Sequence, residues 1–108
     1  MNTFWAILAS AVCAYLIGSI SFAVIVSKLY SKKDVRDYGS GNAGMTNVLR
    51  NFGKVPAALT LLGDFGKGIV AVLLGRLFFS LFGVTSFDGA YVAGLFALLG
   101  HMYPIYFG

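Results

Sequence analysis

Long apolar stretches alternate with one polar segment along this chain, and the apolar stretches predict helices that cross a lipid bilayer. Residues 2–27 contain no charged side chain, which is ample for a helix that crosses a hydrocarbon core of about 30 Å at about 1.5 Å per residue. We therefore predict a first membrane helix over about 3–26. A cleavable signal peptide is the alternative, but such peptides begin with a basic region, and residues 1–5 carry no basic side chain.

Two later apolar stretches predict further membrane helices. The second is expected over about 56–82, because proline suits the first turn of a helix and Pro56 opens this stretch. The third is expected over about 89–103, since Asp88 is a typical helix-starting residue and Pro104 lacks the N–H group that would continue the helix.

These three helices make the chain an all-α, polytopic membrane protein. The segment 27–55 is then expected to be a loop between the first two helices, and 83–88 a short turn between the second and the third. Residues 1–108 are interpreted as a single membrane domain.

The composition agrees with a membrane protein. Hydrophobic residues make up 58% of the chain, charged residues 11%, and the mean hydropathy is +0.82, which is too apolar for a soluble domain of 108 residues. Cys13 is the single cysteine, so neither a disulfide framework nor a cysteine metal cluster is expected. No metal and no organic cofactor is predicted.

The basic residues predict the orientation of the chain. Six of the eight lysines and arginines lie in the first loop: Lys28, Lys32, Lys33, Arg36, Arg50 and Lys54. By the positive-inside rule this loop faces the cytoplasm and the N-terminus faces outward. With two aspartates the loop has a net charge of +4, equal to that of the whole chain, so the basicity is local and no nucleic-acid partner is expected. Attraction to anionic lipid accounts for part of it.

Small residues recur at helical spacing in the first and third predicted helices. They are Ala11, Ala14, Gly18 and Ser21 in the first, and Ala90, Gly94 and Ala97, followed by His101, in the third. Such stripes let helices approach closely in lipid, where packing drives association. Helix packing is therefore their expected role.

Three polar residues inside the predicted membrane helices are candidates for a functional site, because polar side chains are costly at membrane depth. His101 stands at the inner end of the third helix, and a structural hydrogen bond to a backbone carbonyl is its alternative role. Asp64 and Lys67 lie three residues apart on one side of the second helix, close enough to pair. A purely structural ion pair is the alternative. Arg76, near the outer end, is expected to snorkel.

The polar loop contains a glycine-rich segment that suits a phosphate. Gly39, Gly41 and Gly44 allow a concave run of backbone N–H groups. A helical turn from about Thr46 would add its positive N-terminal end and place Arg50 on the same side as Thr46. The glycine spacing also matches the dinucleotide-binding fingerprint, but that motif requires a preceding strand and a βαβ unit. A flexible glycine-rich loop is the remaining alternative.

Residues 39–50, which read Gly-Ser-Gly-Asn-Ala-Gly-Met-Thr-Asn-Val-Leu-Arg, resemble the first signature of the bacterial acyl-phosphate-dependent glycerol-3-phosphate acyltransferases. These are integral membrane enzymes that begin phospholipid synthesis. Residues 18–22 with Lys28, residues 64–68 and residues 100–104 are similar to the family in the same order. Members of the family continue with a basic, glycine-rich stretch and further helices, so the sequence resembles the N-terminal half of such an enzyme.

The resemblance implies an acyltransferase of the bacterial cytoplasmic membrane, with its active loop facing the cytoplasm. The fatty acyl group would pass from acyl phosphate to the 1-hydroxyl of glycerol 3-phosphate, giving lysophosphatidic acid. The implied partners are these two substrates, membrane lipid and a missing C-terminal half. Since acyl phosphate is already activated, the protein's main work would be to hold the two substrates in order and to stabilise charge at the carbonyl.

The resemblance also implies roles for particular residues. The implied set for substrate phosphate comprises Gly39, Ser40, Gly41, Asn42, Gly44, Thr46, Asn47 and Arg50, together with Lys28. Lys67 would add positive charge, Asp64 would orient Lys67, and His101 would contact a polar group of the substrate or transfer a proton.

Two other functions remain as alternatives. A small transporter or anion-channel subunit would use Asp64 and Lys67 as its coupling pair, but compact exporters rely on a carboxylate in their first membrane helix, and this one has none. The other alternative is a non-catalytic, truncated remnant of the acyltransferase.

Overall fold

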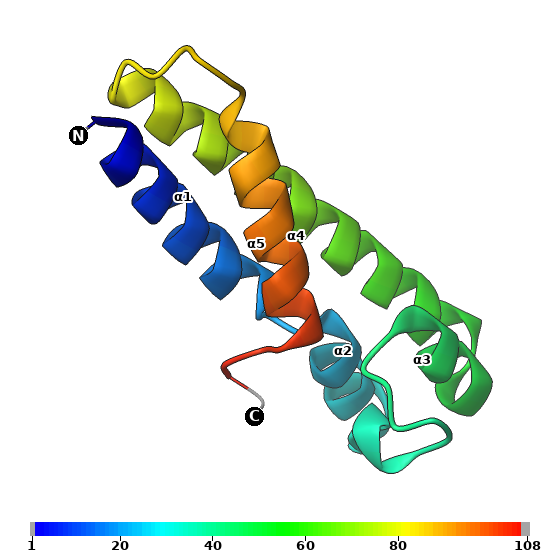
Figure 1. Cartoon of the computed structure of the whole chain (residues 1–108). Coiled ribbons are helices and arrows are strands. Elements are labelled where there is room, and N and C mark those ends of the chain that lie inside the picture. The colour runs from blue at the N-terminus through cyan, green and yellow to red at the C-terminus, as the bar shows by residue number, and fades with distance from the viewer. Residues whose placement is uncertain (1, 107–108) are drawn as a thin grey trace. The chain divides into compact units, whose positions relative to one another are not determined.

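The computed structural model describes residues 2–106, in which every regular element is helical and no strand is found (Figure 1). In chain order the elements are α1 (Asn2–Gly18), α2 (Phe22–Ser31), the short 3₁₀ helix η1 (Val35–Asp37), α3 (Met45–Phe52), α4 (Lys54–Leu81) and α5 (Gly89–Met102). The all-α prediction is thus confirmed over these residues.

The residues form two compact units. The first unit comprises Met1–Ile20 and Gly66–Gly108, and the second comprises Ser21–Phe65. The helix α4 contributes to both, with residues 54–65 in the second unit and residues 66–81 in the first. Each unit is a packed body with its own candidate site.

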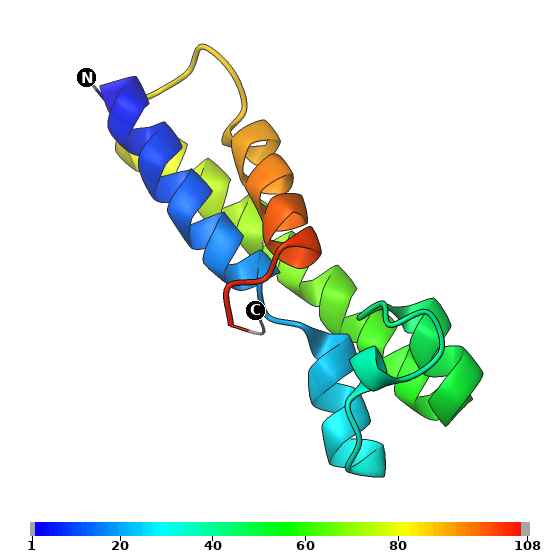
Figure 2. The ribbon, with the colours of Figure 1, turned by 60° about the horizontal axis from the view of Figure 1, so that its bottom comes forward.

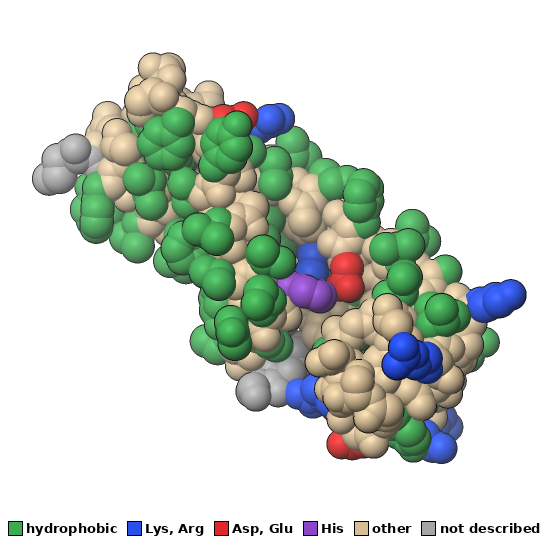
Figure 3. All heavy atoms as spheres, turned by 45° about the vertical axis from the view of Figure 1, so that its right-hand side comes forward, with side chains coloured by type: hydrophobic (Ala, Val, Ile, Leu, Met, Phe, Trp, Pro, Cys, Tyr) green, Lys and Arg blue, Asp and Glu red, His purple; other side chains and the backbone are tan. Residues whose placement is uncertain are grey.

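Two helical stretches are long and apolar enough to cross a membrane, namely Asn2–Ser31 and Lys54–Leu81, whereas α5 is a shorter apolar helix of 14 residues. Large apolar side chains on α4 stand exposed, with Leu62 and Phe65 each 67% accessible, and hydrophobic side chains cover much of the face in Figure 3. Such exposure is costly in water and is normal against lipid tails. The membrane prediction therefore rests on two long helical stretches and one short helix.

The prediction of one continuous helix over 3–26 is wrong, because residues 19–21 separate α1 from α2. Ser19 donates its hydroxyl proton to the Tyr15 carbonyl at 2.8 Å. Ser21 caps the start of α2 by accepting the Val24 N–H at 3.3 Å. Serine side chains compete with the backbone for hydrogen bonds, so this pair breaks the helix without a proline.

The predicted loop 27–55 contains more helix than expected, since α2 continues to Ser31 and both η1 and α3 follow. The buried hydroxyl of Ser27 ties η1 to α2: it donates to the Val24 carbonyl and accepts the Val35 N–H, both at 3.1 Å. The segment is therefore a folded part of the second unit.

An ion pair closes the turn between α2 and η1. Asp34 caps η1 by accepting the Arg36 N–H at 2.9 Å, and its carboxylate also accepts from the Arg36 guanidinium at 2.7 and 3.1 Å. This two-pronged hydrogen bonding holds the pKa of the Asp34 carboxyl below its ordinary value.

The helices of the first unit meet over small side chains. Ala14 of α1, Ala71 of α4, and Ala93 and Ala97 of α5 form its buried cluster. Figures 1 and 2 show α1 and α5 side by side. A Cβ atom at Gly18 would collide with the Ala97 backbone, and one at Gly100 would collide with the Tyr15 backbone. Close backbone contact thus requires glycine at both positions.

The packing face of α5 agrees with the predicted stripe Ala90, Gly94, Ala97 and His101 at Ala97 only. At the other three positions the structure buries the preceding residue, namely Gly89, Ala93 and Gly100. Small residues stand at helical spacing on two adjacent faces of α5, so their periodicity alone cannot choose between them. The stripe of α1 is as predicted, with Ala11, Ala14 and Gly18 buried.

The ends of α4 and α5 lie close to their predicted positions. The helix α4 begins at Lys54, so Pro56 lies in the first turn, where its missing N–H costs nothing. Asp88 caps α5 by accepting the Ala90 N–H at 2.9 Å. Arg76 donates to the Asp88 carboxylate at 3.0 Å, and this hydrogen bond lowers the pKa of Asp88.

Replacing Gly100 with alanine is expected to destabilise the first unit by roughly 1–3 kcal/mol, because the added methyl group meets the backbone of α1. Gly94→Ala is the matched control, since a Cβ there has nothing within 4 Å and alanine favours a helix by up to about 1 kcal/mol. Unfolding in detergent micelles with increasing dodecyl sulfate would compare the two midpoints. A Gly100→Ala midpoint at or above that of Gly94→Ala would contradict the close backbone contact.

Candidate functional site

A pocket of about 390 Å³ opens in the second unit at the N-terminal end of α3. Its lining consists of Ser40, Asn42, Gly44, Met45, Thr46, Asn47 and Arg50. All of these except Met45 belong to the phosphate-binding set that the family resemblance implies, so the fold brings most of that set together around one hollow.

The pocket presents hydrogen-bond donors to a ligand. Gly44 is the N-cap residue of α3 and has no side chain to bond the free N–H groups of the first turn. Those N–H groups have no acceptor within the helix, and the helix dipole makes this end positive. Arg50 lies further along α3, is exposed and lines the same pocket. The pocket is therefore suited to an anion.

Two glycines shape the turn that leads into the pocket. Gly39 and Gly41 have φ angles of +52° and +77°, a left-handed conformation that favours glycine. The Gly41 N–H donates to the Tyr38 carbonyl at 2.9 Å, which closes the turn. A Cβ atom at Gly39 would collide with the Asn47 side chain. Neither Gly39 nor Gly41 lines the pocket, so their contribution there is to the path of the backbone.

Asn47 holds the same turn together from α3. Its side chain is buried, and its amide nitrogen lies within 3.0 Å of three backbone carbonyl oxygens, those of Val35, Tyr38 and Asn42. Its amide oxygen accepts from the Asn51 side chain at 2.9 Å. Asn47 therefore lines the pocket, but its side-chain N–H groups are already hydrogen-bonded to the loop backbone. Asn51, which has this supporting role, was not predicted, because no local pattern marks it.

Lys28 does not line the phosphate pocket. Its side chain is about half exposed, and its ammonium nitrogen lies 3.8 Å from the Asp34 carboxylate. It adds positive charge to the second unit without contacting the pocket.

The first unit holds a second polar cluster, around Lys67. This lysine is buried at 8% exposure, and its ammonium donates to the carbonyl oxygens of Gly18 at 2.9 Å and Ile20 at 2.7 Å. The ammonium nitrogen also lies 2.8 Å from Nδ1 of His101. The sequence singled out Lys67 and His101 but missed the two carbonyls. The signal that could have found them is the serine pair that breaks the first helix.

The other members of the predicted catalytic set are half-buried. His101 lies in the last turn of α5, and its purple side chain reaches the surface in Figure 3. Asp64 lies on α4 three residues before Lys67. The hydrogen bonds of Lys67 to Gly18 and Ile20 stabilise the broken end of the first helix.

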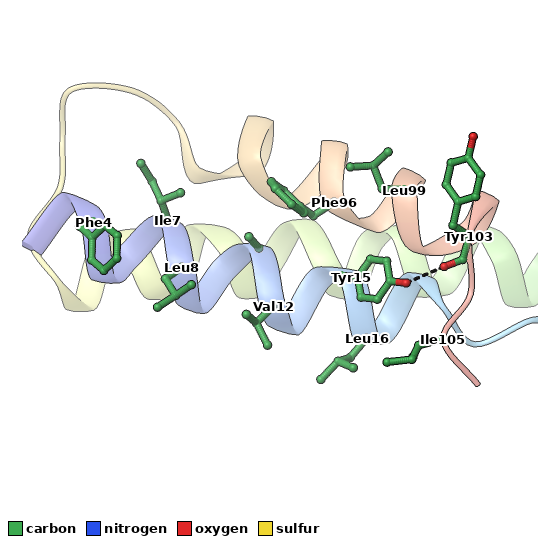
Figure 4. Close-up of a pocket in the computed structure, with 11 residues that line it drawn as sticks. Phe4, Ile7, Leu8, Val12, Tyr15, Leu16, Phe96, Leu99, Tyr103 and Ile105 are labelled. Atoms are coloured by element: carbon green, nitrogen blue, oxygen red, sulfur yellow. Dashed lines mark hydrogen bonds between the residues drawn. The ribbon is translucent and has the colours of Figure 1, made fainter. Parts of the chain in front are cut away.

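A larger hollow of about 670 Å³ runs along α1 and α5 in the first unit (Figure 4). Apolar side chains from both helices line it, and the Tyr15 hydroxyl donates to the Tyr103 carbonyl at 2.6 Å at one end. This groove suits hydrocarbon and offers almost nothing to a phosphate.

One family of known proteins matches most of this chain. The sequence model of one family, described as glycerol-3-phosphate acyltransferase, matches residues 8–108. The chain belongs to this family. The match covers α5, α4, α3 and α2, and most of α1, so both the phosphate pocket and the Lys67 cluster lie within it.

Individual relatives carry the same name. A glycerol-3-phosphate acyltransferase of Neisseria meningitidis is 60% identical over 95 residues, which cover 88% of this chain and 47% of the relative. Those of Chromobacterium violaceum and Ralstonia nicotianae are 53% and 51% identical, covering 93% and 98% of this chain. The chain spans about half the length of the curated relatives it matches. No solved structure matches it.

Replacing Asn47 with aspartate is expected to loosen the turn at the phosphate pocket. The change removes the amide donor and places a carboxylate against three carbonyl oxygens, and each buried group left unpaired costs about 1–3 kcal/mol. Hydrogen exchange of residues 38–44 should become at least tenfold faster. Asn42→Asp, at an exposed position, is the matched control and should leave exchange nearly unchanged; equal effects of the two would refute the role of Asn47.

Proposed function

We propose that this chain supplies the glycerol-phosphate site of a glycerol-3-phosphate acyltransferase. The observation that carries the proposal is the pocket at the start of α3, where an uncapped helix N-terminus and Arg50 converge. A phosphate dianion satisfies both the free N–H groups and the forked guanidinium. The names of the relatives identify glycerol 3-phosphate as the phosphate compound to test first.

In the proposed reaction, acyl phosphate is the acyl donor. The 1-hydroxyl oxygen of glycerol 3-phosphate attacks the acyl carbonyl carbon, the bond from that carbon to the phosphate oxygen breaks, and the hydroxyl proton is transferred to a base or to the departing phosphate. The products are lysophosphatidic acid and inorganic phosphate. No nucleophilic side chain is required, so catalysis consists of positioning and of stabilising charge.

The pocket residues divide this work by their chemistry. Arg50 and the first-turn N–H groups of α3 bind the phosphate of glycerol 3-phosphate, and Ser40, Asn42 and Thr46 donate further hydrogen bonds from the pocket wall. Asn47, with Gly39 and Gly41, holds the backbone in the conformation that forms the pocket.

The Lys67 cluster serves the acyl-transfer step in this proposal. His101 contacts a polar oxygen of the substrate, Lys67 adds positive charge, and Asp64 orients Lys67 from the preceding turn of α4. Polar side chains in helices this apolar are energetically costly, and function is the usual reason that they are retained.

The chain is proposed to lie in the bacterial cytoplasmic membrane with three membrane-crossing helices. The segment between the first two crossings carries six of the eight basic residues, and the positive-inside rule places such a segment in the cytoplasm. Glycerol 3-phosphate would then reach its pocket from the cytoplasmic side.

Arg50→Ala is expected to reduce acyl-phosphate-dependent formation of lysophosphatidic acid about 10- to 100-fold at low glycerol 3-phosphate, because charge-assisted hydrogen bonds contribute about 1.5–3 kcal/mol. Ser40→Ala, which removes a neutral donor, should cost about 2- to 10-fold. The assay uses this chain joined to the second half of the Neisseria meningitidis relative, alongside the chain alone.

Lys54→Ala is the control for this experiment, since it removes one positive charge from an exposed residue outside the pocket. It should leave the Michaelis constant for glycerol 3-phosphate within about twofold. Near-normal kinetics for both pocket variants would remove the phosphate assignment, and an inactive parent chimera would count against the acyltransferase proposal itself.

The orientation can be tested with single cysteines. In a Cys13→Ala background, which removes the one native thiol, Ser40→Cys should react with a membrane-impermeant maleimide only after the cytoplasmic side is opened. Ser86→Cys, in the turn between α4 and α5, should react from outside in intact cells. Labelling of Ser40→Cys in intact cells would overturn the proposed orientation.

A further inference from the structure

Lys67 occupies an unusual position for a charged residue, between a break in an apolar helix and the one histidine of the chain. It is buried, and three acceptors lie within 2.9 Å of its ammonium nitrogen. A buried charge in an apolar environment persists only when it is well bonded. Two of these acceptors are backbone carbonyls and the third is a histidine ring nitrogen, so the ammonium contacts both the broken helix and His101.

Two of the acceptors exist because the first membrane helix is broken. The last carbonyls of a helix lack N–H donors from a following turn, and residues 19–21 remove that turn after α1. Gly18 and Ile20 would therefore present unpaired carbonyl oxygens in a setting without water. The Lys67 ammonium donates to both, which fixes its position relative to α1.

The third acceptor is Nδ1 of His101, at 2.8 Å. An ammonium group has protons to donate and no lone pair with which to accept. The hydrogen bond therefore runs from Lys67 to His101, and Nδ1 must carry its lone pair and no proton. In the neutral imidazole the single proton is then on Nε2.

The other ring nitrogen of His101 is left for a ligand. Within residues 2–106, Nε2 has no hydrogen-bond partner, and the side chain is half exposed. With its proton on Nε2, His101 can donate a hydrogen bond there but cannot accept a proton. This tautomer suits an oxygen that gains negative charge during a reaction.

We propose that Lys67 is a positioning residue that holds His101 in the Nε2–H form, so that His101 donates a hydrogen bond to a substrate oxygen and does not act as a general base. The assignment of the tautomer stands on the geometry of Lys67 alone. The identity of the oxygen, on the carbonyl or phosphate of an acyl phosphate, rests on the proposed function.

The chain offers a direct measurement, because it contains a single histidine. In the full chain, labelled with ¹⁵N-histidine and placed in lipid nanodiscs near neutral pH, one ring nitrogen should be protonated and one bare, and the protonated one should be Nε2. The bare Nδ1 resonance should be displaced toward lower frequency by its hydrogen bond. Protonation of Nδ1, alone or together with Nε2, would overturn the proposal.

Two variants of Lys67 separate positioning from folding. Lys67→Met keeps the length of the side chain and removes the donor, so the Nδ1 resonance should return to the frequency of a nitrogen without a hydrogen bond. Lys67→Arg restores a charged donor and should restore the displaced resonance. An unchanged Nδ1 resonance in Lys67→Met would contradict the proposal. Should that variant fail to fold, the spectrum of the unsubstituted chain still decides the tautomer.

The role of Nε2 is tested by two amides in the chimeric enzyme. Glutamine places its N–H₂ near the position of Nε2, and asparagine places it near Nδ1. His101→Gln should therefore retain at least tenfold more activity than His101→Asn. Equal or higher activity for His101→Asn would refute donation from Nε2, whereas a chimera inactive before substitution would count against the proposed function and leave the nitrogen spectrum unaffected.

Discussion

The absence of water around the membrane helices is the constraint on which the first unit depends. In that setting each backbone carbonyl released from a helix must find a donor in the protein. At the break at residues 19–21, Lys67 is the donor for the carbonyls of Gly18 and Ile20. The charge that is costly in an apolar helix is thereby stabilised by the irregularity of its neighbour. The break and the lysine are two parts of one arrangement, to which His101 adds a third acceptor.

In the second unit a neutral side chain is the donor for backbone carbonyls outside regular hydrogen bonding. The side-chain amide of Asn47 donates to the carbonyls of Tyr38 and Asn42 in the turn at residues 38–42, and to that of Val35 in η1. Because Asn47 belongs to the first turns of α3, the same helix that lines the pocket also fixes the turn in front of it. The pocket is shaped before any ligand arrives, which favours tight binding of a small anion.

The sequence predicted the helical class and the approximate ends of α4 and α5, because apolar runs, prolines and caps act locally. Most of the pocket lining was implied by the resemblance of residues 39–50 to a known family. The sequence did not predict the helix break, because serine also occurs inside helices. Ser19 and Ser21 end a helix only where their hydroxyls form hydrogen bonds with the backbone, which the sequence does not show. On α5 it predicted Ala97 correctly but placed the other small residues of the packing face one position too late, because small residues stand at helical spacing on two adjacent faces there. Lys28 looked equivalent to Arg50 by charge, but only the fold shows that it faces Asp34. Contacts between residues far apart in the chain, such as that of Lys67 with Gly18, leave no trace in local periodicity.

Gly44 illustrates a conflict between the stability of a fold and its usefulness. At φ −141° and with nothing within 4 Å of a Cβ atom, its place in the backbone tolerates other residues. A serine or aspartate there would cap α3 and stabilise it by about 1 kcal/mol. It would do so by occupying the N–H groups that open into the pocket, and an aspartate would repel an anion as well. With glycine at this position, α3 gives up the stability of a side-chain cap and keeps its first N–H groups available to an acceptor in the pocket.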